Sequence, residues 1–541
     1  MLTYRPTVDR PAAQSQDKPW LLLLLCLFWL LPGLVGHDPW KPHENESMAI
    51  VAYFMRSSDW TLAWVAGIPQ FEQAPLYYWC AALLANALAW FGVVAHDAAR
   101  LSTGLWMALA MWGTGLAARE LFGRRFGRVA VVILLGSLGL PLWAHHISPA
   151  IILLCGFAWL AYALILATRL PVRAGVIMAL VFLVLLTGAS WADALLAALI
   201  AFSLPIFPMW RRASYGITLM TALLIAFPFA ALWGYALKTL SPELFQIWWR
   251  FYAWGPYGGA KSFVYGNNLL SLPSLLIWFA WPALPLAAWA FYVFRKELSQ
   301  ARWQLLLLML VAQFLYIALA GKASEVLALP LLMTLSLIAC AAVDELRHGA
   351  AAALNWFSMF ALGLAALIIW LCWFALVTGM PQAVALRLQA YGVNPMSMFG
   401  FGVAFAVLVT LLWGRILFRK RPIGRRALTN WACGVTLLGG LLVGLFQSWV
   451  DSGKSYRPVA TGVIAAMKSY PEQCIDVAAL AQDPISALSY FSYLKLKATA
   501  VNDCQFVMQQ GLNAAAPVGA QLIWQGQRLG NKQEFFSLYH R

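Results

Sequence analysis

The sequence predicts an all-α polytopic membrane protein with a small α/β domain at its C-terminal end. Hydrophobic residues make up 62% of the 541 residues and charged residues only 11%, far from the balance of a soluble domain. Apolar runs of roughly 17–25 residues recur along the chain, and each is long enough to cross a bilayer as a helix. After residue 447 the composition becomes that of an ordinary soluble domain.

The apolar runs predict about thirteen membrane-spanning helices, by the criterion of ~20 residues per span. The first run, Trp20–Gly36, lacks a small-x-small cleavage site, so we interpret it as an uncleaved span and not as a signal peptide. Leu76–Ala95 is interpreted as an interfacial or re-entrant helix, because counting it as a span would invert every later loop. The predicted spans are 20–36, 100–119, 127–144, 149–168, 174–190, 192–209, 214–237, 273–294, 304–320, 326–343, 358–378, 397–417 and 427–447.

The net charge of +16 is distributed mainly over short turns between the apolar runs. This is the pattern of the positive-inside rule, so we expect no nucleic-acid partner. Arginine-rich turns, such as 119–128 and 415–426, predict the cytoplasmic side, together with the N-terminus. The first loop (37–99), the loop 238–273 and the C-terminal tail are then expected outside the cytoplasm.

Two domains are predicted, a transmembrane domain over 1–447 and an outer α/β domain over 448–541. In the second domain CIDVAAL, QFVMQQG, AQLIWQGQ and EFFSLYH have the pattern of short strands, and ISALSYFSYLKL has the pattern of a helix. Cys474 and Cys504 lie in this domain, where a disulfide and two free thiols are equally open alternatives. The other six cysteines lie in apolar runs and are interpreted as packing residues.

The first loop gathers acidic side chains in a protein that is otherwise poor in acids. Carboxylates are costly to hold near lipid, which favours a functional role. Pro42, His43 and Glu44 can simply start a helix whose dipole stabilises Glu44. Alternatively, Glu44 or His43 activates an acceptor, or binds a metal or a substrate amine. The acidic residues of the loop include Asp38, Glu44, Glu46, Asp59 and Glu72.

Other polar or aromatic groups occur at the predicted outer ends of spans. Phe71–Trp79 places an acid before a proline-started aromatic helix, which is either an interfacial anchor or a wall beside a lipid-linked substrate. The aromatic loop 238–273 is either an interface belt or a lid. His145 and His146 point in different directions on a helix, so a shared metal is not expected. Lys322 and Glu325 also lie at a predicted outer edge, where the lysine either snorkels or binds phosphate.

Several of these segments match motifs of one family. Its first loop reads W-x-P-D-E, then G-x-x-Y-F-E-K-P-P-L-x-Y-W, and a K-x-P-x-Y-x-x-P element lies near its tenth span. Through these motifs the chain resembles the GT-C membrane glycosyltransferases, in the branch of the protein O-mannosyltransferases and the lipid A aminoarabinose transferase. The matching text is Trp40 to Glu44, Met55, Asp59-Trp60, Gly67, Phe71 to Trp79, Arg100-Leu101-Ser102, Ala117 to Gly123, Gly321-Lys322 and Pro330.

The chain departs from the family pattern at four positions. The aspartate of P-D-E falls on His43, and the lysine of E-K-P falls on Gln73. A second family aspartate falls on Ser148, and the tyrosine near the tenth span falls on Val326. The scaffold is therefore expected to be retained while the site is rebuilt for another donor or acceptor, or has lost activity. The retained family residues are Glu44, Glu72, Arg100 and Lys322.

The resemblance implies a multi-pass bacterial inner-membrane glycosyltransferase. It would move a hexosyl or pentosyl group, with inversion, from a polyprenyl-phosphate donor to lipid A, a glycan or a protein at the periplasmic face. Glu44, with His43, is implied as the acceptor-activating base, and Asp38 as a reserve carboxylate. No cofactor is certain, and a role for a divalent metal stays open. The implied substrate-binding residues are Glu72, Gln73, Tyr77, Arg100, Arg250 and Lys322.

Two other classes of function use the same features. A transporter or flippase of lipid-linked sugars would use the membrane-embedded charges as a pathway. It is less favoured, because the sequence shows neither an inverted repeat nor paired broken helices. A non-catalytic binding protein on the same scaffold would tolerate Glu44→Gln.

Overall fold

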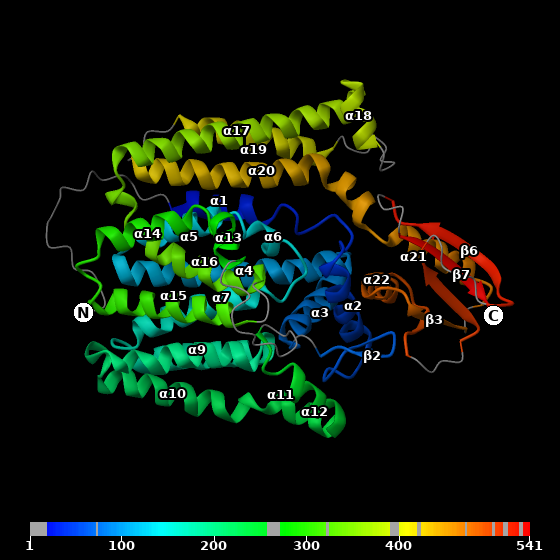
Figure 1. The fold of residues 1–541 in the computed structure, drawn as a ribbon, viewed down its shortest axis with the longest axis horizontal. Coiled ribbons are helices and arrows are strands. Elements are labelled where there is room, and N and C mark those ends of the chain that lie inside the picture. Colours follow the sequence, from blue (N-terminus) through cyan, green and yellow to red (C-terminus); the bar gives the residue numbers. More distant parts are fainter. Residues whose placement is uncertain are drawn as a thin grey trace.

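A long helical bundle carries a small sheet domain at one end (Figure 1). The helices run side by side along the long axis, and α2 (His43–Arg56) and α3 (Leu76–Ala89) of the first loop lie at the end next to the sheet domain. This arrangement confirms the predicted fold class. The computed structural model describes residues 19–71, 74–256, 271–320, 324–389, 400–418, 423–470, 473–499, 504–511, 518–529 and 534–541.

By length and hydropathy, five helices of the described residues can each cross a membrane, and the bent pair α13–α14 adds a sixth. Seven further apolar helices have only 10–17 residues, so the number of spans stays a prediction. The bundle helices are α1 (Pro19–Leu30), α4 (Ala95–Phe122), α5 (Phe126–Gly136), α6 (Pro141–Ala144), α7 (Ile151–Leu166), α8 (Pro171–Gly188), α9 (Trp191–Ser203), α10 (Ala213–Ala230), α11 (Leu232–Leu240), α12 (Pro242–Phe251), α13 (Ser271–Phe279), α14 (Ala283–Val293), α15 (Ala301–Leu319), α16 (Glu325–Cys340), α17 (His348–Thr378), α18 (Gln382–Gln389), α19 (Phe401–Leu417) and α20 (Ile423–Lys454).

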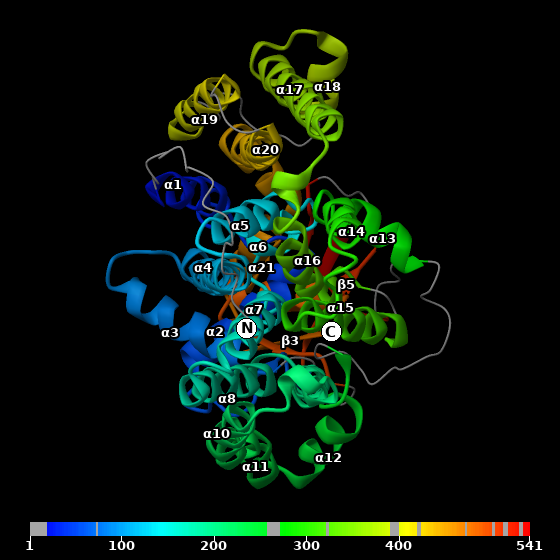
Figure 2. The ribbon, with the colours of Figure 1, turned by 90° about the vertical axis from the view of Figure 1, so that its left-hand side faces the viewer.

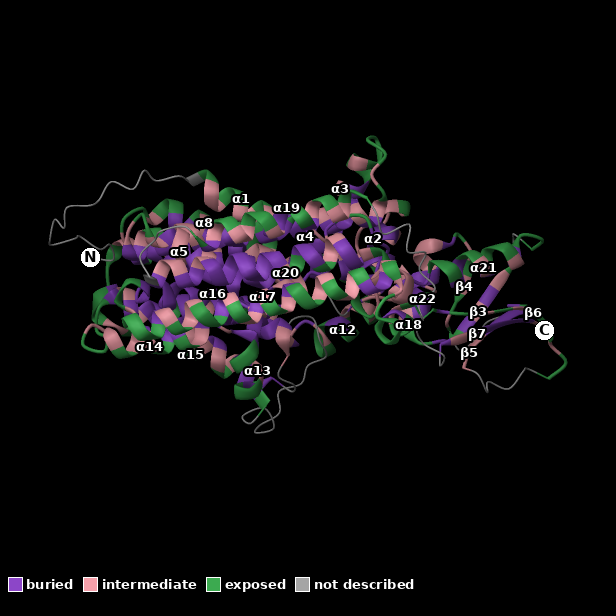
Figure 3. Cartoon of the chain, turned by 90° about the horizontal axis from the view of Figure 1, so that it is seen from above, coloured by how far each residue is buried: buried purple, intermediate pink, exposed green. Residues whose placement is uncertain are grey.

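The core of the bundle lies around α7 and α16, in which nearly every residue is buried. Both helices are apolar on all sides, as suits a helix surrounded by other helices. Buried residues are concentrated along the middle of the bundle (Figure 3). At the periphery, α10 and α17 expose large apolar side chains such as Phe227 and Phe360, which are suited to contact with lipid.

Helices α17, α19 and α20 form a group on one flank, beside α1 (Figure 2). A Cβ atom built on Gly402 of α19 would lie 2.3 Å from the carbonyl oxygen of Gly444 of α20. Small residues at such contacts allow the backbones of two membrane helices to approach closely. This packing places α20 against α1 and brings its C-terminal end to the first loop.

More than one predicted span is broken in the structure. The span predicted over 127–144 is divided into α5, which ends at Gly136, and the short α6, which begins at Pro141. The span predicted over 273–294 consists of α13 and α14, which meet at an angle of 97°. Pro282 lies at the break and has no backbone N–H to continue the hydrogen bonding of α13. A second difference is a hairpin in the first loop, β1 (Trp64–Val65) and β2 (Ile68–Pro69), which the sequence analysis did not predict.

The C-terminal domain is a five-stranded sheet in the order β4-β3-β5-β7-β6, with α21 (Arg457–Met467) and α22 (Gln482–Phe491). The four predicted strands are present as β3 (Cys474–Ala479), β5 (Phe506–Gln510), β6 (Gln521–Gln527) and β7 (Phe535–His540). The helix predicted over ISALSYFSYLKL is wrong in its second half. The helix ends at Phe491, and the alternating residues Lys495–Lys497 form β4, which completes the sheet edge by parallel pairing with β3.

The sheet domain is tied to itself and to the first loop. Cys474 and Cys504 form a disulfide with a Cα–Cα distance of 5.1 Å, which confirms the bonded alternative. The amide of Ala498, just after β4, donates a hydrogen bond of 2.9 Å to the carbonyl of Ala66 in the β1–β2 turn. The predicted domain boundary at 447/448 falls inside α20, which continues without a break to Lys454.

Candidate active site

Helix α2 holds the polar residues of the first loop at the junction of the two domains. Pro42 is its N-cap, and Glu44 and Glu46 lie in its first turn, where the helix dipole favours a carboxylate. One side of α2 packs on α3, and Ala49 joins the hydrophobic core of the C-terminal domain. The position of α2 is therefore fixed by both domains.

Glu44 forms a fully buried ion pair with Arg100 of α4, at 2.8 Å between Oε1 and Nε, and neither side chain is exposed. Oε1 also accepts the amide of Ile147 at 2.9 Å, and Oε2 accepts the amide of Trp40 at 2.8 Å. Burial raises the pKa of Glu44, but the charges of Arg100 and two histidines outweigh this effect and lower the pKa to about 2. Such a carboxylate is a weak base whose oxygens already have partners.

Arg100 uses its remaining donors on the chain just after α1. Nη1 donates to the carbonyl of His37 at 2.8 Å and to Asp97 at 3.0 Å, and Nη2 donates to the carbonyl of Asp38 at 2.7 Å. With Nε on Glu44, the guanidinium is enclosed by protein acceptors. This geometry favours a structural role for Arg100 over the predicted contact with a donor phosphate.

The segment His145–Pro149, which follows α6, is held in place by this network. Besides the bond from Ile147 to Glu44, the carbonyl of His146 accepts the hydroxyl of Thr103 at 2.8 Å. His145 and His146 line one cavity, whereas Ser148 and Pro149 line another. The segment is thus a wall that two cavities share.

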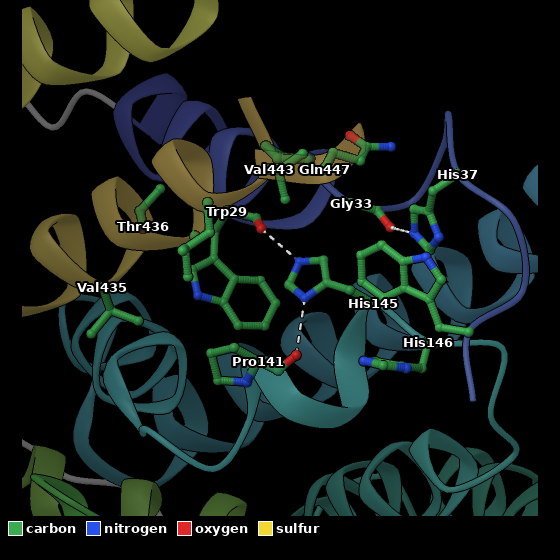
Figure 4. A pocket seen from close by; sticks show the side chains of 14 residues that line it. Trp29, Gly33, His37, Pro141, His145, His146, Val435, Thr436, Val443 and Gln447 are labelled. Atoms are coloured by element: carbon green, nitrogen blue, oxygen red, sulfur yellow. Dashed lines mark hydrogen bonds between the residues drawn. The ribbon is translucent and has the colours of Figure 1, made fainter. Parts of the chain in front are cut away.

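The first cavity has a volume of about 180 Å³ and lies between α1, α6 and α20 (Figure 4). The ring of His145 lies within hydrogen-bonding distance of two carbonyl oxygens, 2.9 Å from Trp29 and 3.2 Å from Pro141. His37 lies at the other end, 3.1 Å from the carbonyl of Gly33. The wall of this first cavity is mainly apolar, and we call it the His145 cavity.

The second cavity has a volume of about 150 Å³ and lies between α2, α3, α6 and α16. Its wall combines an imidazole, a carboxylate, a hydroxyl and aromatic rings, which is a more polar lining than that of the His145 cavity. We call it the His43 cavity. It is lined by His43, Glu46, Ser47, Ile50, Gln70, Tyr78, Trp143, Ser148, Pro149 and Val326.

His43 lies against a tryptophan that also binds an acid. The rings of His43 and Trp143 are 5.6 Å apart between centroids and inclined by 30°. The indole Nε1 of Trp143 donates a hydrogen bond of 3.2 Å to Oε2 of Glu325, in the first turn of α16. Partial burial lowers the pKa of His43, and the negative charge of Glu325 acts in the opposite direction. A neutral imidazole beside a carboxylate is well suited to accept a proton.

The other predicted site residues that the structure describes lie apart from this cavity. The hydroxyl of Tyr77 is buried at 2.6 Å from that of Thr103, so Tyr77 packs against α4. Asp38 is bound by Arg457, with Nε at 2.8 Å, and by Ser455. Arg250 is exposed on α12, which lies beside the first loop because Tyr252 stacks on Phe71. Glu72, Gln73 and Lys322 lie outside the described residues.

Sequence reasoning missed one side chain beside the His43 cavity, Trp143. Tyr78 lines the cavity and belongs to the segment Phe71–Trp79, which was predicted as one of two alternatives to be a wall beside a lipid-linked substrate, whereas Tyr77 does not line it. Trp143 comes from an apolar span, and no local pattern places it against Glu325, which was predicted at an outer edge together with Lys322. The described residues hold no group of three or more His, Cys, Asp or Glu side chains that could bind a metal ion.

No protein-family model and no curated protein matches the sequence. Among solved structures, ArnT from Cupriavidus metallidurans bound to undecaprenyl phosphate superimposes with a TM-score of 0.67 at 18% identity, covering 97% of this chain and 98% of ArnT. The apo state of the same ArnT gives a TM-score of 0.65 at 17% identity and covers 96% and 97% of the two chains. The similarity extends over both domains. The chain therefore has the GT-C fold of ArnT, a lipid A aminoarabinose transferase.

Proposed function

We propose that this protein is a membrane glycosyltransferase whose reaction takes place in the His43 cavity. One observation carries the proposal. Three of the four positions at which the chain departs from the family motifs, His43, Ser148 and Val326, line this single cavity although they come from distant parts of the sequence. A retained scaffold with replacements clustered at one cavity is what we expect of a site rebuilt for a different substrate.

The proposed donor is a sugar linked to polyprenyl phosphate. The support is the fold shared with an ArnT that binds undecaprenyl phosphate. The donor phosphate needs cationic partners, for which we propose Lys322 and Arg250. Glu72 and Gln73 are proposed to contact the sugar or the acceptor. Arg100 is reassigned, with Glu44, to hold the wall between the two cavities.

His43 is the proposed acceptor-activating base. It lies at the cavity and is exposed, whereas Glu44 is buried, ion-paired and strongly acidic. The acceptor attacks the anomeric carbon as polyprenyl phosphate leaves from the opposite face, which gives inversion in a single displacement. A lipid, a glycan and a protein are all admissible acceptors of this chemistry.

The site is proposed to face the periplasm of a bacterial inner membrane. The first loop, α12 and the C-terminal domain lie at one end of the bundle, whereas the arginine-rich turns 119–128 and 211–212 lie between helices at the other end (Figure 1). Positive residues favour the cytoplasmic side. The disulfide in the C-terminal domain also fits an oxidising compartment.

The decisive experiment measures transfer of radiolabelled sugar from a panel of undecaprenyl-phosphate sugars to membrane extract. Wild type should transfer label from one donor, and His43→Ala should reduce the rate by about 10²–10⁴-fold, the usual contribution of a general base. His348→Ala is the matched control, because His348 is exposed at the start of α17. Equal transfer by all three proteins would remove His43 from the mechanism.

A non-catalytic binding protein is the second candidate, favoured by the replacement of two family aspartates by His43 and Ser148. It predicts that wild type binds a lipid-linked sugar and transfers no label to any acceptor in the extract. Mass spectrometry of lipids and glycans from a deletion strain then separates the two. Loss of one sugar modification supports the enzyme, whereas an unchanged envelope supports the binding protein.

A further inference from the structure

Glu325 has no part in the proposed function so far. It lies in the first turn of α16, and the preceding residue, Ser324, caps that helix by accepting the amide of Leu327 at 3.4 Å. The carboxylate of Glu325 accepts the indole N–H of Trp143 at 3.2 Å, and the same indole lies against the ring of His43. An imidazole, an indole and a carboxylate from α2, α6 and α16 therefore form one row beside the cavity.

We propose that Glu325 is a positioning residue that holds His43, through Trp143, in place to accept the proton of the acceptor. Its negative charge stabilises the imidazolium that results. The inference rests on the proposed function, because it gives Glu325 a role in that reaction. Orientation by a carboxylate is a general way to fix an imidazole and to favour its protonated form.

The step balances in atoms and charge. The acceptor oxygen or nitrogen forms a bond to the anomeric carbon with its own electron pair. The bond between that carbon and the phosphate oxygen breaks, and polyprenyl phosphate leaves with the bonding pair. The acceptor proton moves to a ring nitrogen of His43, so the imidazole gains one positive charge as the phosphate gains one negative charge. Glu325 favours the first of these changes, because its negative charge attracts the positive charge of the imidazolium.

The charged surroundings of His43 make the inference testable. On its own helix, Glu44 is bound to Arg100, and Glu46 lines the cavity. From α3, Tyr78 lines the cavity, and from α16 the charge of Glu325 raises the pKa of His43 against the effect of burial. Removing the charge of Glu325 should therefore lower the pKa of His43 further.

The test measures the titration of His43 without using activity. Full-length protein in detergent is treated with diethyl pyrocarbonate across pH, and modification of the His43 peptide is followed by mass spectrometry. In Glu325→Gln the midpoint should move to lower pH by about 0.5–1 unit, as for the loss of a nearby opposite charge. Glu120→Gln is the matched control, because Glu120 pairs with Arg169 and does not line the cavity, and it should leave the midpoint where it is in wild type. An unchanged midpoint in Glu325→Gln would overturn the proposal.

Two conservative variants guard against misfolding. Glu325→Asp keeps the charge and should keep the wild-type midpoint. Trp143→Phe keeps a ring against His43 but removes the N–H that binds Glu325, and should give an intermediate midpoint. If the Glu325→Gln protein does not insert into the membrane, the Trp143→Phe variant takes its place. A midpoint of His43 modification in Trp143→Phe equal to that of wild type then overturns the proposal.

The activity arm separates this inference from the proposed function. His43 works as a base when neutral, so the acid limb of the pH–rate profile should move to lower pH in Glu325→Gln, with kcat reduced about tenfold and KM little changed. A merely structural role would lower the rate without moving the limb. A shifted midpoint with no transfer from any donor would support the interaction between Glu325 and His43 and refute the proposed transferase activity. Transfer with an unshifted midpoint would support the transferase activity and refute the positioning role of Glu325.

Discussion

Arg100 and Glu44 form an ion pair of 2.8 Å in which neither side chain is exposed. The pair connects α4 to α2, and through the amide of Ile147 it also fixes the wall between the two cavities. Both residues match family motifs, and the sequence alone is equally consistent with a position at the reacting atoms. Their burial shows instead how the first loop is held on the bundle.

Glu44→Gln should therefore destabilise the protein. Removing one partner leaves the Arg100 charge buried and uncompensated, at a cost of about 3–5 kcal/mol. The unfolding midpoint in detergent, followed by circular dichroism, measures the loss. Glu120→Gln is the control, because it breaks an exposed pair with Arg169 at 2.9 Å that contributes at most ~1 kcal/mol. A Glu44→Gln protein with normal stability and no transfer activity would return Glu44 to the role of base.

The ion pair of Asp38 with Arg457 should make domain docking sensitive to acid. Burial raises the pKa of Asp38, but Arg457 and Ser455 outweigh this effect and hold it below the usual value. The contribution is thus present above the unfolded-state pKa of about 3.9 and is lost as pH falls through the lower folded-state value. Hydrogen exchange of residues 37–42, corrected for intrinsic rates, should rise in that range.

In Arg457→Gln the same exchange should rise at a higher pH, because Asp38 loses the charge that favours its ionised form. Arg541→Gln is the control, since Arg541 pairs with Asp476 inside the C-terminal domain at 3.2 Å. Equal exchange in the two variants would show that the Asp38 pair does not hold the junction.

Asp483, at the start of α22, should give the opposite dependence on pH. Burial raises its pKa to about 6, with Lys41 opposing and Glu534 adding to the effect. A raised carboxyl pKa stabilises the folded state at low pH, and this stabilisation is lost as pH rises from about 4 to 6. Asp483→Asn should raise the melting temperature relative to wild type at pH 7.5 more than at pH 5. The same change at both pH values would contradict the assignment.

The disulfide between Cys474 and Cys504 should contribute about 2–4 kcal/mol to the stability of the C-terminal domain, because it closes a loop of 30 residues. Cys474→Ser with Cys504→Ser should lower its melting temperature, and dithiothreitol should lower that of wild type to the same value. Cys372→Ser, at a free cysteine, is the control. If dithiothreitol has no effect on wild type, the bond does not stabilise the domain.

Apolar runs were sufficient to predict the fold class and the position of most helices, because length and composition decide whether a segment can cross a membrane. They did not give the rotation of each helix about its axis. A helix that is apolar all round, such as α16, carries no amphipathic signal that shows which residue faces a cavity. Val326 was placed by the motif alone, and Trp143 was not found at all.

The motif in the first loop identified the correct segment but not the role of each side chain. Glu44 and His43 are neighbours, yet one is buried in an ion pair and the other lies at a cavity. The difference comes from Arg100, which is 56 residues away in the sequence. Pairing at such a distance leaves no trace in the local pattern, and the same is true of the contact between Trp143 and Glu325.

The junction between α2 and the C-terminal domain also sets an order of events during synthesis. Asp38 leaves the ribosome early, whereas Asp451, which accepts its amide at 3.0 Å, follows 413 residues later. At translation rates of about 5–20 residues per second, tens of seconds separate the two. The first loop must therefore stay incompletely packed until the helices of the bundle and the C-terminal domain have been synthesised. A chain that stops before α22 would carry every residue of the His43 cavity and still lack the surface on which α2 settles.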